Sequence, residues 1–305
     1  MAVRPAAGMK SLTLGRWPTY SPACQRDVMR LLRAGGSLTA YRSNPAFPYG
    51  PRRESWAWKA ERLAEKLFKI KHAVLCNSGT MALQAGLWAL NLPPGSTIIT
   101  SPFTFSATPA AIIHAGHRPV FADVHPDTFC LDPKSVSSIP MPLGKEAMLP
   151  VDLFGRIAFE AMGNLAFSST AILEDACQAV GANVNGFWGG AMGNVGAFSF
   201  NGAKNAPAGE AGMAVMNDDD LAQRVRRFCN HGENWLYFEV GLNGRVNELT
   251  ACVAYHGLLA VKARNAQRRW LALELWRRLK DEKRLRILTP QEIEEHALYV
   301  YAFRV

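Results

Sequence analysis

The sequence lacks paired cysteines, long hydrophobic runs and low-complexity tracts. Its six cysteines are scattered without any C-x-x-C spacing, which argues against a disulfide framework or a zinc site and is typical of a reducing cytoplasm. The most apolar stretch, 73–90, is interrupted by Asn77, Ser78, Thr80 and Gln84, which argues against a membrane span. The N-terminus has no apolar run of signal-peptide length. We therefore expect a cytoplasmic globular protein with no metal site and no membrane partner.

Acidic residues are also scarce, since 25 Asp and Glu stand against 34 Lys and Arg, for a formal net charge of +9. Much of the excess lies in a basic run at 262–286. A nucleic-acid or anionic-substrate surface would explain this run, and so would the solvated face of a long helix. We favour the helix face and expect no nucleic-acid partner, because no nucleic-acid-binding motif accompanies the charge. The positive balance also suits a phosphate-bearing substrate.

Short apolar runs alternate with helix-like segments along the chain, and this alternation predicts a mostly parallel sheet covered on both faces. At 305 residues the chain can hold one large domain plus part of a second. In the helix that Ser55 begins, we expect Trp56, Ala60, Leu63 and Leu67 to share one face. Strands are expected at 73–76, 97–100, 119–122, 148–153, 171–173, 196–200 and 212–216, and other helices at 24–34, 80–90, 106–115, 221–228 and from 246 into the basic run.

The segment 76–81, Cys-Asn-Ser-Gly-Thr-Met, follows an expected strand and opens an expected helix. Backbone N–H groups at a helix start point outward at the positive end of the helix dipole, and this geometry binds phosphate. By itself, S-G-T at a helix start is more often only a cap. The segment matches neither a Walker loop nor G-x-G-x-x-G, so a nucleoside triphosphate or a dinucleotide has little support.

A carboxylate stands at the carboxyl end of an expected buried strand, in the segment 174–178, Glu-Asp-Ala-Cys-Gln. Parallel α/β sheets bind ligands at that end. A carboxylate there can hold a metal, cap a helix or pair with a cationic ring nitrogen, and capping is the commonest of the three.

Lys204 follows the strand expected at 196–200, in a loop of small residues ahead of the glycine-rich segment 209–212. Most lysines extend into solvent, but apolar flanking strands and this loop would hold the amine near the sheet edge. Desolvation makes an amine easier to deprotonate and frees it to attack a carbonyl. Together the three segments offer a phosphate cradle, a carboxylate for a pyridinium nitrogen and a lysine for a Schiff base, which are the needs of pyridoxal phosphate.

Several motifs in one order make the chain resemble the DegT–StrS family of sugar aminotransferases from about residue 56 to about residue 260. The spacing of 29 residues from Asp175 to Lys204, and of 39 from Lys204 to Asn243, is also similar to the family's. The resemblance implies an aspartate-aminotransferase-like α/β fold, with a three-layer large domain around a mostly parallel sheet and a small C-terminal α+β domain. The motifs are NSGTMAL, SPFTFSAT, PVFADVHPDTFCLDP, EDACQAVGA, FSFNGAKNAPAGEAG, RFCNHG and GLNGRVNEL.

On this resemblance, we expect the large pyridoxal-phosphate-binding domain, with its N-terminal helical segment, at 1–245. A linking helix and the start of a truncated C-terminal domain are expected at 246–305. In the family that small domain helps to close over the substrate.

The resemblance implies a phosphate site shared between two subunits. Thr80 would hold the cofactor phosphate together with the backbone of Gly79 and Met81, and Ser199 would add its hydroxyl. Asn243 would reach the phosphate of the neighbouring subunit, which implies a homodimer with shared active sites.

The resemblance also implies how the ring of pyridoxal 5′-phosphate is held. Lys204 would carry the cofactor as a Schiff base and serve as general base and acid. Asp175 would pair with the protonated ring nitrogen and keep the ring an electron sink, and Gln178 would hydrogen-bond the phenolic oxygen. Phe105 would stack on the ring; without the T-F-x-A-T context, a core phenylalanine would be favoured.

The implied activity is transfer of an amino group from glutamate or glutamine to a keto sugar, typically nucleotide-linked, in amino-sugar, polysaccharide or antibiotic biosynthesis. A branch of the family that performs dehydration carries histidine where this chain has Lys204, so the lysine favours transamination. The alternatives are a keto-cyclitol aminotransferase, a sugar dehydratase relative and a non-catalytic cofactor-binding or regulatory relative.

Two residues, one stretch and the C-terminal end depart from the family pattern. Ala211 replaces a glycine and costs backbone freedom. Gly244 stands where an aromatic residue is usual, which makes contacts to the sugar less predictable. The stretch 156–170 is shorter than in the family, and the chain stops at Val305, where the small domain would begin.

Overall fold

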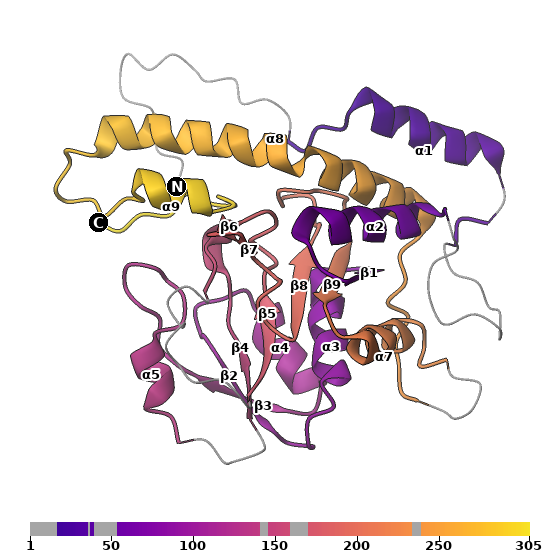
Figure 1. Cartoon of the computed structure of the whole chain (residues 1–305), viewed down its shortest axis with the longest axis horizontal. Helices are drawn as coiled ribbons and strands as arrows, with labels where there is room; N and C mark the ends of the chain where they lie inside the picture. The colour runs from indigo at the N-terminus through magenta and orange to yellow at the C-terminus, as the bar shows by residue number, and fades with distance from the viewer. Residues whose placement is uncertain (1–16, 36, 40–53, 141–145, 159–169, 234–238) are drawn as a thin grey trace, which may run out of the picture.

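A seven-stranded sheet forms the centre of the computed structural model, which describes residues 17–35, 37–39, 54–140, 146–158, 170–233 and 239–305 (Figure 1). Its spatial order is β1-β9-β8-β5-β4-β2-β3. The strands are β1 (His72–Cys76), β2 (Thr97–Thr100), β3 (Arg118–Phe121), β4 (Glu146–Leu149), β5 (Ala171–Asp175), β8 (Val195–Ser199) and β9 (Gly212–Met216). From β8 to β3 all pairings are parallel, whereas β9 runs antiparallel to β1 and β8. The mostly parallel sheet expected from the sequence is confirmed.

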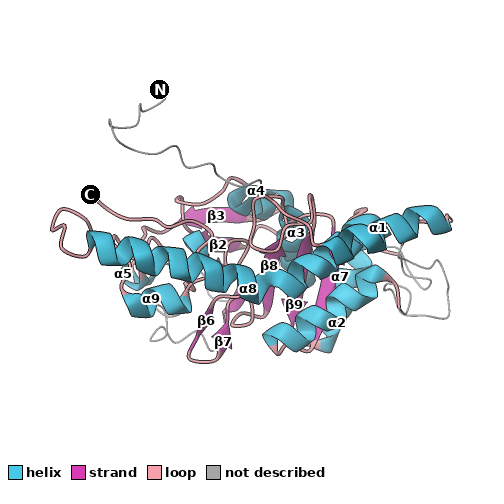
Figure 2. Cartoon of the chain, turned by 90° about the horizontal axis from the view of Figure 1, so that it is seen from above, coloured by secondary structure: helices cyan, strands magenta, loops and turns pink. Residues whose placement is uncertain are grey.

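Helices cover both faces of this sheet, and a short hairpin, β6 (Asn183–Val184) with β7 (Phe187–Trp188), lies beside it. The helical elements are α1 (Pro22–Ala34), α2 (Trp56–Phe68), α3 (Gly79–Ala89), α4 (Ala107–His114), α5 (Pro133–Ser137), the 3-10 turn η1 (Leu153–Gly155), α7 (Asp219–Cys229), α8 (Glu248–Leu279) and α9 (Pro290–Glu295). Residues of α2 and α8 pack in one core cluster, and those of α3, α4 and α7 pack in another. Figure 2 shows α8 running across the molecule with α1 and α2 beside it. This arrangement gives the three layers that the sequence predicts.

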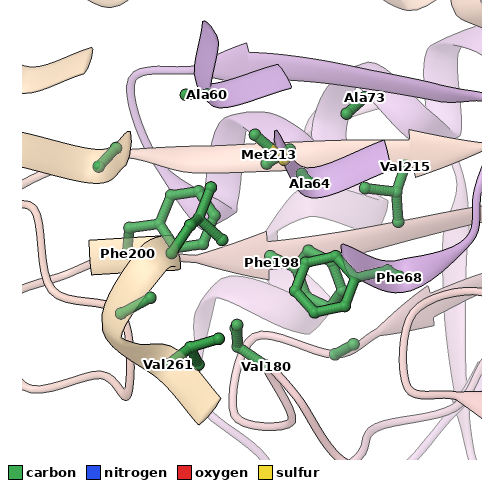
Figure 3. Packing of buried hydrophobic residues seen from close by; sticks show 14 of the residues in the cluster. Ala60, Ala64, Phe68, Ala73, Val180, Phe198, Phe200, Met213, Val215 and Val261 are labelled. Atoms are coloured by element: carbon green, nitrogen blue, oxygen red, sulfur yellow. The ribbon is translucent and has the colours of Figure 1, made fainter. Parts of the chain in front are cut away.

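Alternate residues of the strands belong to two different hydrophobic cores. Met213 of β9 packs with α2 and α8, whereas its neighbour Ala214 packs with α3, α4 and α7. In the first core, the rings of Phe68 from α2 and Phe198 from β8 lie 5.0 Å apart between centroids (Figure 3). Successive side chains of a strand point to opposite faces, so a sheet covered on both faces needs continuous apolar strands.

Ser55 begins α2 as the sequence predicts, because its hydroxyl accepts the N–H of Trp58 at 3.1 Å. The expected apolar face is present but lies toward the rim of the core. Its members Trp56, Leu63 and Leu67 are only partly buried. The fully buried apolar residues of α2 are the small Ala57, Ala60 and Ala64, together with Phe68, which is 2% exposed. Small side chains let α2 lie close against α8, which periodicity alone does not reveal.

The basic run forms much of α8, and its solvated-face interpretation needs correction. Arg277 and Arg278 are exposed as expected. Arg264, Arg268 and Arg269 are half-buried instead, and burial lowers the pKa of each guanidinium. All three donate hydrogen bonds to main-chain carbonyls that are distant in sequence, at Thr19 (2.9 Å), Leu298 (3.0 Å), Tyr299 (3.1 Å) and His296 (3.3 Å). These arginines therefore fasten other segments onto α8.

Other boundaries agree with the sequence to within a few residues, with one real difference. The strand expected at 148–153 ends at Leu149, because the chain then turns through η1 toward β5. Within the described ranges, no helix is long and apolar enough to cross a bilayer, and no cluster of His, Cys, Asp or Glu has metal-binding geometry. The domain division at 245/246 stays a prediction. Residues 40–53 and most of 156–170 lie outside the described residues.

Candidate functional site

A cavity of about 410 Å³ lies at the carboxyl ends of β1, β5 and β8. This is the sheet edge at which parallel α/β proteins bind ligands. Two of the residues singled out in the sequence, Met81 and Asn243, are not among those that line it. The lining does include Gly79, Thr80, Phe105, Asp175, Gln178, Ser199 and Lys204, which come from motifs far apart in the chain.

The N-terminus of α3 forms one wall of the cavity. Ser78 caps this helix, since its hydroxyl accepts the N–H of Met81 at 3.1 Å. The capping bond uses the Met81 N–H that was expected to face a phosphate. The N–H groups of Gly79 and Thr80 belong to the first helical turn and have no acceptor inside the helix. With the Thr80 hydroxyl, they are the donors that an anion in this cavity would meet.

Two glycines allow the strands to approach this helix start. A Cβ on Gly212 would come within 2.2 Å of the Ser78 carbonyl carbon, so β9 passes directly against the turn. A Cβ on Gly79 would come within 2.9 Å of both Cys177 Sγ and Ser199 Cβ. Any side chain at either position would push the helix N-terminus away from the strand ends.

Asp175, at the end of β5, is 5% exposed and is fixed by two donors. The hydroxyl of Thr108 on α4 donates to Oδ2 at 2.7 Å, and the Cys177 N–H donates to Oδ1 at 3.2 Å. Burial, followed by the charge of Asp175, raises the pKa of the Cys177 thiol well above its usual value. The thiol is therefore neutral at physiological pH and does not compete with Lys204 as a nucleophile.

Two further carboxyl groups lie buried behind Asp175. Glu174 accepts the N–H groups of Gly190 at 2.8 Å and Met192 at 3.0 Å. Asp152 accepts one N–H, at 2.8 Å, through Oδ1 only, and no donor in the described part of the chain reaches its Oδ2. Burial and the nearby Glu174 raise the pKa of Asp152 well above its usual value. We infer that Asp152 keeps its proton, so that it adds no negative charge beside Asp175.

Phe105 and Gln178 present their side chains to the cavity in different ways. Phe105 is 70% exposed, so it is not the core phenylalanine that composition alone would favour. An aromatic face left open in a cavity can stack on a planar ligand. The Gln178 Oε1 accepts the Phe154 N–H at 2.9 Å, which leaves the amide nitrogen as the donor of that side chain.

Lys204 lies in the loop after β8, and its main-chain N–H donates to Asn201 O at 2.9 Å. Its Nζ lies 4.1 Å from the centroid of the Tyr299 ring, and both residues line the cavity. Lys204 therefore reaches the site, as the sequence predicts, rather than solvent.

The geometry agrees with comparisons to known proteins. A model of the DegT/DnrJ/EryC1/StrS aminotransferase family matches residues 50–305. The chain belongs to this family. This match confirms the family expected from the motifs. Solved structures of the same fold hold pyridoxamine phosphate or a ketimine intermediate, which confirms the expected fold and cofactor.

Individual relatives match over most of this chain. A pleiotropic regulatory protein of Geobacillus stearothermophilus is 35% identical over 77% of this chain and 65% of its own length. A UDP-2-acetamido-2-deoxy-3-oxo-D-glucuronate aminotransferase of Pseudomonas aeruginosa is 34% identical, over 79% and 67% respectively. The structure of DesV from S. venezuelae, in complex with a ketimine intermediate, is 30% identical with a TM-score of 0.79, and the match covers 92% of this chain and 73% of DesV. The chain thus spans about half to two thirds of the length of several curated relatives.

The residues present fit the cofactor of the DegT/DnrJ/EryC1/StrS family. A planar cationic ring needs a carboxylate and an aromatic face, which Asp175 and Phe105 offer within one cavity. A phosphate needs several donors, which the α3 N-terminus supplies. The cavity volume of about 410 Å³ is in the range of small-molecule sites.

The departures from the family pattern have structural explanations. Ala211 is fully buried and is not among the residues with positive φ, so the lost glycine freedom is not needed there; Gly209, with φ of +83°, makes the turn. A Cβ on Gly244 would come within 2.9 Å of Met81 Cγ, so an aromatic residue cannot take this backbone position without moving Met81. Asn243 is exposed outside the cavity of its own chain, and its carbonyl accepts Asn77 Nδ2 at 3.0 Å.

The cavity residues that were not singled out from the sequence include Thr108, Glu210 and Tyr299. Thr108 stands inside the SPFTFSAT motif, four residues from Thr104, whose hydroxyl it meets at 2.8 Å. Glu210 accepts Asn201 Nδ2 at 2.8 Å and stands in the glycine-rich segment, so both had a motif signal. Tyr299 had none, since it comes 95 residues after Lys204 in a segment without regular structure.

Proposed function

We propose that this chain is a pyridoxal-phosphate-dependent aminotransferase that transfers an amino group from glutamate or glutamine to a nucleotide-linked keto sugar. One observation carries the proposal: a single cavity collects an amine, a buried carboxylate, an open aromatic face and a helix N-terminus. Relatives named as aminotransferases of UDP- and dTDP-sugars support the sugar class.

Each proposed role follows from the position of a group. The N–H groups of Gly79 and Thr80, with the Ser199 hydroxyl, would bind the phosphate. Asp175, which accepts hydrogen bonds from the Thr108 hydroxyl and the Cys177 N–H, would pair with the ring nitrogen. These contacts would fix the position of the ring.

Three further residues would act on the ring and its substituents. The Gln178 amide nitrogen would donate to the ring oxygen, and Phe105 would cover one ring face and exclude water from it. When bound, pyridoxal phosphate supplies an electron sink for the carbon that loses a proton. Lys204 Nζ would attach the cofactor covalently, and would take the proton from the α-carbon of the amino donor once it is released.

A second copy of the chain would complete the phosphate site. Asn243 is exposed and does not line the cavity of its own chain, although the family motif GLNGRVNEL that contains it is present. We propose that Asn243 reaches the phosphate site of a partner in a homodimer. A test is Asn243→Ala, which should weaken cofactor binding only where the protein is dimeric.

Cofactor attachment is tested by adding pyridoxal 5′-phosphate, reducing with borohydride and mapping the mass increment by peptide mass spectrometry. We expect the increment on Lys204 and its loss in Lys204→Ala. Lys262→Ala, which alters an exposed lysine of α8, is the matched control and should behave as the natural sequence does. An increment on another lysine, or none, would overturn the assignment of Lys204.

Amino transfer is tested separately on the loaded protein. Glutamate or glutamine should convert the bound cofactor to its pyridoxamine form, and a UDP- or dTDP-linked keto sugar should reverse the change. Reversal by keto-cyclitols alone would favour the cyclitol alternative. No conversion by any amino donor would leave a non-catalytic or dehydrating relative.

A further inference from the structure

Tyr299 brings an aromatic face to the reactive lysine. Its ring centroid lies 4.1 Å from Lys204 Nζ, well within the distance of about 6 Å at which a cation and a ring attract. Both side chains line the same cavity, and Tyr299 is only partly exposed. The contact therefore stabilises the Lys204 amine in the position that it takes when it is not attached to the cofactor.

The segment that carries this ring is anchored from two directions. Arg268 of α8 donates to the carbonyls of Leu298 at 3.0 Å and of Tyr299 at 3.1 Å. Ala297 N–H donates to the carbonyl of Gly155 at 2.9 Å. Leu298, between Ala297 and Tyr299, takes a positive φ of 52°, a conformation that costs free energy in a residue with a side chain. A backbone held this closely fixes the direction of the Tyr299 side chain.

A buried pair of amides ties the same segment to the lysine loop. Asn205, the residue after Lys204, donates through Nδ2 to Ala297 O at 2.6 Å and to Asn265 Oδ1 at 2.7 Å. Asn265 in turn donates to Val180 O at 3.0 Å. Asn205 and Asn265 are only 2% and 3% exposed, so these bonds are sheltered from water. The lysine and the ring are thus placed by one connected network.

We propose that Tyr299 is a positioning residue that holds the Lys204 amine whenever Lys204 is not bonded to the cofactor. This inference rests on the proposed role of Lys204 as the attachment residue. In an aminotransferase, the amine must leave the cofactor while the amino donor is bound and must return afterwards. A cation–π contact keeps it within reach during that interval without forming a covalent bond.

The proposal predicts different effects of Tyr299 on the affinities for two forms of the cofactor. Pyridoxal phosphate condenses with the Lys204 amine, forming a C=N bond and releasing one water, so the contact with Tyr299 is given up on binding. Pyridoxamine phosphate cannot condense with an amine, so the contact is present before and after binding. Removing the ring of Tyr299 should therefore affect the affinity for the first ligand and not for the second.

The experiment compares the two affinities in Tyr299→Leu and Tyr299→Phe by calorimetric titration of the full chain. In Tyr299→Leu we expect the Kd for pyridoxal phosphate to fall about two- to fivefold, the size of a cation–π contact at a partly exposed site. The Kd for pyridoxamine phosphate should stay unchanged. Tyr299→Phe keeps the aromatic face and should leave both values unchanged.

Other results would overturn the inference. If Tyr299→Leu weakens both ligands alike, Tyr299 packs against the cofactor and does not serve the lysine. If neither affinity changes, the contact is incidental. Circular dichroism and thermal unfolding check the fold, and Tyr299→Met, which also lacks an aromatic face, replaces Tyr299→Leu should that variant unfold. Failure of amino transfer to sugars would refute the proposed function but leave this comparison intact, since it measures binding only.

Discussion

His296 is a buried histidine whose protonation should loosen the segment that carries Tyr299. It is 3% exposed, and no partner in the described structure reaches its Nε2. Burial, together with the charges of Arg156 and Arg269, lowers the pKa of His296 to about 3, although Glu292 opposes the shift. The imidazole is therefore neutral in the folded protein at any ordinary pH.

The pKa difference fixes the sign of the pH dependence. An unfolded histidine has a pKa of about 6.5, which is above the folded value, so the unfolded state binds the proton more tightly. The resulting contribution to stability is fully present above about pH 6.5 and is lost as the pH falls from about 6.5 toward about 3. At pH 5 the loss amounts to about 2 kcal/mol, since each unit below 6.5 costs about 1.4 kcal/mol. This figure barely depends on the folded pKa as long as that value lies below about 4.

The assay is thermal unfolding of the natural sequence and of His296→Gln at pH 7 and pH 5. With an unfolding entropy of about 2.1 cal/mol/K per residue, 2 kcal/mol corresponds to about 3 °C in Tm for a chain of this length. The natural sequence should therefore lose about 3 °C more than His296→Gln between the two pH values. All other titrating groups, including the half-buried His117, are common to both proteins and cancel. Equal losses would refute the conclusion that the fold keeps His296 neutral.

Two further variants test the packing behind the cavity. Gly212→Ala places a Cβ 2.2 Å from Ser78, so we expect the free energy of unfolding to fall by about 1–3 kcal/mol and pyridoxal phosphate to bind more weakly. Gly202→Ala, which has open space around its Cβ, is the control and should change neither quantity. Thermal unfolding and cofactor titration measure the two effects. Asp152→Asn keeps an N–H donor where we infer a proton, so the free energy of unfolding measured in urea should change by less than about 1 kcal/mol. A loss above about 2 kcal/mol would mean that Asp152 is ionised.

The sequence was sufficient to predict which motifs meet at one ligand-binding cavity. Strand ends of a parallel sheet converge on one edge, so motifs at the ends of β1, β5 and β8 had to meet there. This geometric necessity is why Gly79, Asp175 and Lys204 could be placed together in advance. Local rules also indicated two N-caps, Ser78 and Ser55, since each hydroxyl accepts the N–H of the residue three positions ahead.

The sequence was not sufficient for contacts between segments that no regular element relates. The basic run did not indicate that Arg268 donates a hydrogen bond to a carbonyl 30 residues away, because solvated and buried arginines have the same helical spacing. The same holds for Tyr299, whose position depends on the positive φ at Leu298 and on the buried amide of Asn205. Such contacts follow from tertiary packing, which periodicity and local propensity do not encode.

The charge at the end of β5 depends on how three buried carboxyl groups divide their protons. Three anions so close together would repel one another strongly in a medium of low polarity, so the fold must neutralise or compensate the surplus. Main-chain donors stabilise Glu174, while burial and the nearby Glu174 raise the pKa of Asp152 and so favour its protonated form. Asp175 is stabilised by the Thr108 hydroxyl and is the carboxylate of the three that lines the cavity. A cationic ring nitrogen placed there would meet one oriented carboxyl group, which is the partner that an electron-withdrawing ring requires.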